Sequence, residues 1–242
     1  MRQHEVLGLI LARGGSKGVP RKNMRHVAGR PLLYWTFNAA RRSRMLTRTI
    51  LSTDDAEMAG YARGELIEVP FMRPQELATD SATAIDVTLH AIACLESQEG
   101  WTPEYVALLQ PTSPLRIAAD VDGCIDMAIK RGTNAVLSVV KTCAHPYLMR
   151  TMDEHDVLRP FTNSGLFASR KQDLPPVVMP NGAVYVARTS VLKDLKTWHP
   201  EGAVGYLMPV ERSLDIDTDW DITLADLILG RGNGYNEENT AQ

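Results

Sequence analysis

Two short stretches of the sequence contain the residue types that phosphate chemistry needs. The first, LARGGSKGVPRKN at residues 11–23, follows an apolar run and combines three glycines with two arginines and two lysines. Glycines let backbone N–H groups approach an anion closely, and the cationic side chains supply counter-charges. The spacing fits neither G-x-x-x-x-G-K-[ST] nor G-x-G-x-x-G. We therefore predict a polyphosphate site of another type, with an ordinary glycine-rich turn as the alternative.

The second stretch, SLDIDTDWD at residues 213–221, places Asp215 and Asp217 one residue apart. On a strand, side chains at positions i and i+2 point to the same face, so both carboxylates could bind one hard cation such as Mg²⁺. A calcium loop is disfavoured, because its sixth position is tryptophan where that motif needs glycine. Thr218 or Asp219 can cap a following helix while Asp221 complements its positive end, and this explains Asp219 and Asp221 better than metal binding does. Asp215 and Asp217 remain the metal candidates.

A third stretch, QPTSPLR, places Gln110 and Arg116 on either side of two prolines. A stiff polar loop of this kind can hold a substrate. Taken alone, the stretch is better explained by a turn at Pro111 and Pro114.

All three stretches are expected at strand ends of an α/β fold with a mainly parallel sheet. Short apolar runs predict strands at residues 5–11, 48–54, 66–70, 105–110, 134–140, 181–188 and 205–210. Helical periodicity predicts helices at residues 31–43, 55–63, 83–98, 118–131 and 219–229. This alternation favours parallel strands, whose carboxyl ends share one edge of the sheet and commonly bind ligands there.

Residues 142–180 interrupt the alternation with five prolines and no strong helical period. We expect this segment to be an insertion between two parts of one core, residues 1–141 and 181–230. The polar tail at residues 231–242 is expected to be disordered.

The composition favours a small-molecule partner. Charged residues make up 23% of the chain and the formal net charge is −3, so no global basic field indicates nucleic acid. Three cysteines without a close pair predict neither a zinc site nor a disulfide framework. The apolar run near the N-terminus is too short for a signal peptide or a membrane span. We expect a cytoplasmic protein with no membrane partner.

Together the motifs resemble the acylneuraminate cytidylyltransferase family, the CMP-sialic acid synthetases. The matching motifs stand in family order: ARGGSKGVPRKN, LSTDD, RPQELATDSA, LLQPTSPLR, PNGAVYV and DIDTDWD. The resemblance implies a Rossmann-like nucleotidyltransferase fold in three layers, Mg²⁺ dependence, and a homodimer built largely by residues 142–180. The implied reaction is attack of the anomeric hydroxyl of a nonulosonic acid on the α-phosphate of CTP, with release of pyrophosphate.

The resemblance also implies roles for single residues. Arg13 and Lys17 would neutralise the triphosphate in catalysis, and Asp215 and Asp217 would hold Mg²⁺. The implied nucleotide-binding residues are Ala12, Gly14, Lys22, Asn23, Arg73, Ala82 and Ala84. The implied sugar-binding residues are Gln110, Lys171, Asn181, Tyr185, Trp198 and His199. For Trp198 a place in the core is the alternative.

Two departures from the family pattern leave alternatives open. Ala84 stands where several relatives have a serine near the base, which leaves GTP or another nucleotide as an alternative to CTP. Leu148 and Met149 stand where relatives that bind N-acetylneuraminate often have a lysine, which favours another sugar, such as a legionaminic or pseudaminic acid. A nucleotide-binding protein without catalysis is a third hypothesis, and the pair Asp215 and Asp217 argues against it.

Overall fold

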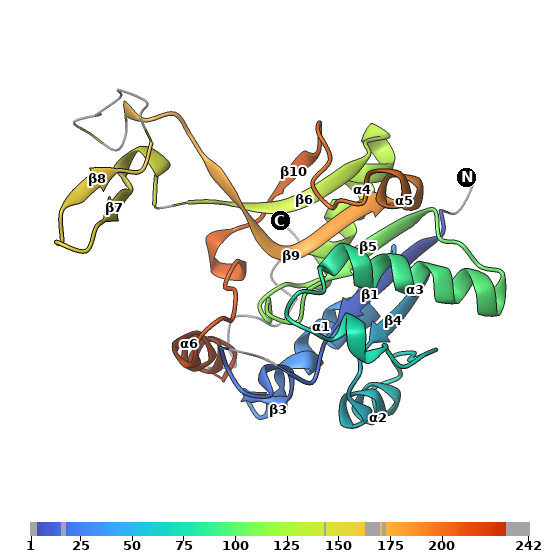
Figure 1. Ribbon diagram of the computed structural model, residues 1–242. Coiled ribbons are helices and arrows are strands. Elements are labelled where there is room, and N and C mark those ends of the chain that lie inside the picture. The colour runs from blue at the N-terminus through green and yellow to red at the C-terminus, as the bar shows by residue number, and fades with distance from the viewer. Residues whose placement is uncertain (1–3, 16–17, 143, 163–169, 171–172, 231–242) are drawn as a thin grey trace.

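The computed structural model describes residues 4–15, 18–142, 144–162, 170 and 173–230, and shows a six-stranded sheet between helices (Figure 1). In spatial order the strands are β10 (Val204–Leu207), β6 (Ala135–Lys141), β9 (Val178–Arg188), β5 (Tyr105–Leu109), β1 (Val6–Leu11) and β4 (Arg48–Ser52). β9 is antiparallel to both neighbours, and the other neighbouring pairs are parallel. The predicted, mainly parallel α/β sheet is confirmed.

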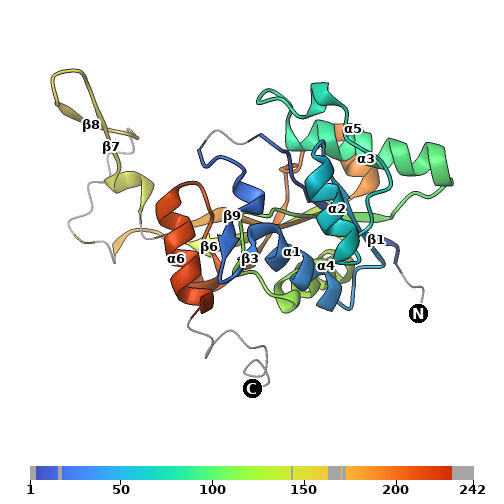
Figure 2. The same cartoon turned by 90° about the horizontal axis from the view of Figure 1, so that it is seen from below.

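Helices cover both faces of this sheet and make three layers (Figure 2). They are α1 (Leu32–Arg42), α2 (Ala56–Gly64), α3 (Ala84–Glu99), α4 (Ala118–Arg131) and α5 (Thr189–Leu195). α1, α2 and α4 pack with Val6 and Ile10 of β1, whereas α3 and α5 pack with Leu7 and Leu9. Because successive strand residues point to opposite faces, a strand covered on both sides must be apolar throughout. This explains the unbroken apolar run of β1.

A sixth helix, α6 (Asp219–Gly230), closes a smaller core beside the cationic loop. Ile222 and Ala225 of α6 pack with Val19 of that loop and with Ile216 of the DIDTDWD segment. The helix begins with a side-chain cap, because the Asp221 carboxylate accepts the backbone N–H groups of residues 217 and 218. The Thr218 hydroxyl in turn accepts the Asp221 N–H at 3.3 Å. Of the two candidates for the cap, Thr218 and Asp219, the structure therefore supports Thr218, with Asp221 at the positive end of the helix as expected, and Asp219 instead pairs with Arg25. This small core holds two motifs together that lie about 200 residues apart in the sequence.

The predicted strand at residues 66–70 is wrong. It makes a single parallel bridge, between Ile50 and Glu68. Leu66 has a left-handed backbone with φ of 60°, and Pro70 cannot donate a ladder hydrogen bond, so pairing stops on both sides of Glu68. The sequence also did not predict the short strands β2 (His26–Val27) and β3 (Arg30–Pro31), which form a tight hairpin.

The segment predicted to be an insertion forms a hairpin that extends away from the main sheet (Figures 1 and 2). Its strands are β7 (Arg150–Met152) and β8 (Leu158–Pro160), which pair antiparallel. β9 begins at Val178, so the last three residues of the predicted insertion belong to the main sheet. The tail at residues 231–242 lies outside the described residues. Over the part of the chain that is described, no helix combines the length and the apolar character needed to cross a membrane.

Candidate active site

A cavity of about 350 Å³ opens at the carboxyl ends of β1 and β5. This is the edge at which the sequence predicts the three polar stretches to meet. Its walls include seven of the predicted site residues, namely Arg13, Lys22, Asn23, Arg73, Ala82, Ala84 and Gln110. Lys17 and Lys171 lie outside the described residues.

Ion pairs and hydrogen bonds hold the cationic loop at the cavity. An Arg13 guanidinium nitrogen lies 2.6 Å from a carboxylate oxygen of Asp80, which also lines the cavity. The Asn23 amide donates to the Arg13 carbonyl oxygen at 3.3 Å, so it fixes the backbone of the loop. Ala12 is buried, and its N–H bonds the Ser52 carbonyl, so any contact it makes with a nucleotide would come from its backbone.

Lys22 joins the loop to the paired aspartates. Its Nζ donates to the Ile216 carbonyl at 2.6 Å and lies 3.5 Å from Asp217 Oδ1. A Cβ atom at Gly18 would lie 2.7 Å from the Asp217 carbonyl oxygen, so only glycine fits this close approach. The loop and the DID motif are therefore in direct contact, which spacing alone does not show.

Asp215 and Asp217 flank the fully buried Ile216, and both are exposed. The segment lies outside the sheet, yet it keeps the expected alternation because the Ile216 N–H bonds the Thr112 carbonyl at 2.9 Å. Desolvation, together with the charge of Asp217, raises the pKa of Asp215. A bound cation would relieve both effects, so this pair fits a divalent metal. Among the described residues, no three His, Cys, Asp or Glu side chains gather at one point, so further ligands would be water or phosphate oxygens.

Arg73 forms the buried wall on the side where the resemblance places the base. The Arg73 guanidinium donates to the Ser52 hydroxyl at 3.1 Å and to the Ser52 carbonyl, and the backbone N–H of Arg73 donates to the Thr53 carbonyl at 2.8 Å. Burial lowers its pKa to about 10. Arg73 is therefore held rigidly at the end of β4.

Ala84, the residue that stands where several relatives have a serine, is the first residue of α3. The neighbouring Thr83 hydroxyl is used in the helix cap with Asp86.

The predicted sugar-binding residues fall into three environments. Gln110 packs on Gly182, where φ is +74° and a Cβ would lie 3.3 Å from the amide oxygen. The ring centroids of Tyr185 and the exposed His199 are 5.4 Å apart. Burial, and to a smaller extent the charge of Asp215, raise the pKa of Tyr185.

Two further sugar-binding predictions gain no support from their positions. Trp198 is 4% exposed and packs in the core behind Tyr185. The buried Asn181 amide bonds the hydroxyl groups of Ser138 and Ser213 at 2.6 and 2.9 Å, so a sugar contact would require exchange of these bonds.

A buried arginine holds this side of the cavity in place. Arg116 donates to the Gln110 and Ala183 carbonyl oxygens, at 3.0 and 2.7 Å, and to the Thr36 hydroxyl at 2.7 Å. Burial lowers its pKa to about 10. It therefore links α1, the loop after β5 and β9. Its place in QPTSPLR was the one signal in the sequence, and its partners could not be inferred from spacing.

Comparisons with known proteins agree with this arrangement. A family model described as cytidylyltransferase matches residues 7–202. An N-acylneuraminate cytidylyltransferase from Escherichia coli is 29% identical over 95% of this chain and 53% of its own length, so the chain spans about half of that relative. A CMP-N,N'-diacetyllegionaminic acid synthase from Legionella pneumophila is 30% identical over 90% of this chain and 94% of its own.

The fold is also found among solved structures. A CMP:2-keto-3-deoxy-manno-octonic acid synthetase in complex with CTP superposes with a TM-score of 0.71 at 14% sequence identity. The similarity covers 94% of this chain and 99% of that structure. From the matched family model and from the relative of nearly equal length, the chain belongs to the cytidylyltransferase family.

Proposed function

We propose that the protein transfers CMP from CTP to a nonulosonic acid. The anomeric oxygen attacks the α-phosphorus, the bond to the β-phosphate oxygen breaks, and pyrophosphate and the hydroxyl proton leave. The observation that carries the proposal is the contact of Lys22, which lines the cavity with Arg13, with Asp217, because it joins the cationic loop to the carboxylate pair beside the cavity. The proposed partners are CTP and a sugar acid, with the cytoplasm as the predicted location and no nucleic acid or membrane.

The cationic loop and the DID motif would neutralise the charge of the triphosphate in two different ways. Arg13 and Lys17 would bind the triphosphate, with Lys22, Asn23 and the loop backbone at Ala12 and Gly14 shaping its site. Asp215 and Asp217 would hold Mg²⁺, which supplies Lewis-acid polarisation of phosphate oxygens when bound. Asp215 must be ionised for this, and the Lys22 ammonium beside the pair favours that state.

The two substrates would occupy opposite walls of the cavity. The base would lie against Arg73, Ala82 and Ala84, and the sugar acid against Gln110. Tyr185 and His199, whose rings pack together, would add to the sugar side, and Lys171, Asn181 and Trp198 stay predictions from the resemblance. Because the transfer is mostly positioning and electrostatic stabilisation, rigid walls of this kind are what it requires.

A nucleotide panel tests this proposal. Pyrophosphate release would be measured with CTP, GTP, ATP and UTP, each with N-acetylneuraminic, legionaminic and pseudaminic acids and, separately, with ordinary sugar phosphates. We expect release with CTP and one of these acids, and none after Mg²⁺ is chelated. Preference for GTP would contradict the choice of base and support the alternative suggested by Ala84. Release with ordinary sugar phosphates alone would contradict the choice of acid.

We also propose a homodimer through residues 142–180. The hairpin and the start of β9 expose large apolar side chains, with Met152, Leu158 and Phe161 each above 60% exposed. An apolar surface of this kind on a hairpin that extends from the core favours burial against a second copy. Leu158→Asp is expected to convert a dimer to monomers in sedimentation at micromolar concentration. Leu195→Asp, at a comparably exposed position on α5, should leave the dimer intact. A wild-type monomer would contradict this proposal.

A further inference from the structure

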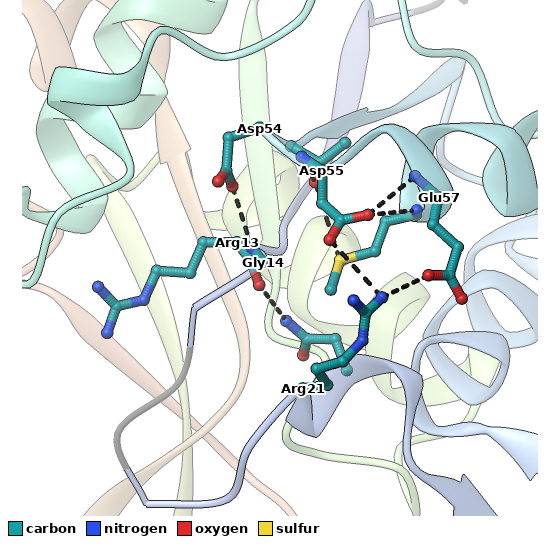
Figure 3. Close-up of polar contacts among 9 residues, drawn as sticks. Arg13, Gly14, Arg21, Asp54, Asp55 and Glu57 are labelled. Carbon is teal, nitrogen blue, oxygen red and sulfur yellow. Dashed lines mark hydrogen bonds and ion pairs between the residues drawn. The ribbon is translucent and has the colours of Figure 1, made fainter.

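Asp54, which follows β4, binds the backbone of the cationic loop (Figure 3). Its Oδ1 accepts the Gly14 N–H at 3.0 Å. The parallel register pairs Leu11 with Ser52, so the loop after β1 and the aspartates after β4 leave the sheet side by side. The Gly14 N–H is thus already used, and it does not point to the cavity as a phosphate donor.

The position of the neighbouring Asp55 is explained by its role in capping α2. Its Oδ1 accepts the N–H groups of Glu57 and Met58 at 2.9 Å, which caps α2. A Cβ at Gly14 would lie 3.0 Å from Asp55 Oδ2, so a larger residue there would crowd the Asp55 carboxylate. Asp54 makes no such cap, and its bond to Gly14 is its contact with the loop.

A carboxylate beside a triphosphate site needs an explanation, because like charges repel. The charge of Asp54 favours the protonated state of the Arg73 guanidinium, so it raises the pKa that burial lowers. Arg73 is 6% exposed, so a counter-charge offsets part of its desolvation. Asp54 therefore serves both as a counter-charge for this buried cation and as the acceptor for the Gly14 N–H.

We propose that Asp54 is a positioning residue for nucleotide binding, acting through the Gly14 N–H. The bond that fixes Gly14 also fixes the direction in which the preceding Arg13 side chain enters the cavity. Figure 3 shows that side chain directed away from Asp54 and Asp55. A hydrogen bond to a carboxylate is stronger than one between neutral groups, so loss of this bond should free the start of the loop. The inference rests on the proposed function only for the identity of the nucleotide.

The test compares Asp54→Ala with Asp54→Asn in the full chain. Alanine removes the acceptor, whereas asparagine keeps an oxygen that can accept the Gly14 N–H. We expect faster hydrogen exchange in the peptide that contains Gly14, and about tenfold weaker CTP binding by calorimetry, for the alanine variant. Asparagine should restore both to within about threefold of wild type. With turnover established, KM for CTP should rise more than kcat falls.

Asp226→Ala is the matched control, because Asp226 accepts the Ala28 N–H at 2.7 Å in the same kind of bond, away from the cavity. It should leave Gly14 exchange and CTP binding unchanged. Wild-type exchange at Gly14 in Asp54→Ala would overturn the inference, whatever the reaction. Equal losses with alanine and asparagine would also overturn it, since charge alone would then explain the effect. A wild-type protein that binds no CTP would overturn the proposed function, while Gly14 exchange would still test Asp54.

Discussion

Asp217→Asn is expected to lower kcat by about a hundred- to a thousandfold while CTP still binds. Asparagine keeps the size of the side chain but removes one of two carboxylates that would hold Mg²⁺ against the phosphates. The loop cations would remain, so binding of the nucleotide should change far less than turnover. Pyrophosphate release gives kcat, and calorimetry with and without Mg²⁺ gives CTP affinity.

Asp219→Asn is the control for this variant. Asp219 is a nearby exposed aspartate that pairs with Arg25 at 3.4 Å, so its loss should leave kcat within about twofold of wild type. If Asp217→Asn retained full turnover, the metal assignment would be wrong. If wild type bound CTP but formed no product with any acid, the protein would be a nucleotide-binding protein without catalysis.

Arg116→Met is expected to lower the free energy of unfolding by about 3 to 5 kcal/mol. Methionine fills much of the space, but the Ala183 carbonyl and the Thr36 hydroxyl lose the arginine donor, and the Gln110 carbonyl is left with the longer bond from the Ser113 N–H at 3.3 Å. Buried carbonyl groups without partners are costly, because water cannot reach them. Urea denaturation at constant protein concentration would measure the change.

Arg25→Met provides the comparison for an arginine on the surface. The pair of Arg25 and Asp219 is largely exposed, so its loss should cost at most about 1 kcal/mol. A cost for Arg116→Met no larger than this would contradict the structural role of Arg116. Any Arg116 variant that folds should also show a raised KM for the sugar acid, since Gln110 loses its anchor.

Much of the fold could be predicted from the sequence, because strands covered on both faces must be apolar at every position. β1, β4, β5 and β6 follow directly from this rule, as do the periodic helices between them. The direction of β9 could not be predicted, since an apolar run has the same composition in either direction. The strand expected at residues 66–70 failed because one left-handed residue and one proline outweighed its apolar content.

The candidate site could be predicted as a set of motifs but not as a set of contacts. Glycine and cation content identified the loop, and the one-residue spacing identified Asp215 and Asp217. The partners of these groups come from elsewhere in the chain. Asp80 pairs with Arg13 across 67 positions, and Asp54 binds Gly14 across 40. Such pairs depend on strand order, which local sequence patterns do not encode.

The most direct test of the account is a pyrophosphate assay on the wild-type protein, with the second product identified by mass spectrometry. With CTP, Mg²⁺ and a nonulosonic acid present together, the account predicts pyrophosphate and a CMP-linked sugar acid in equal amounts. Omission of any one of the three should stop both. Pyrophosphate without a CMP-linked product, or no pyrophosphate with any acid and any nucleotide, would contradict it.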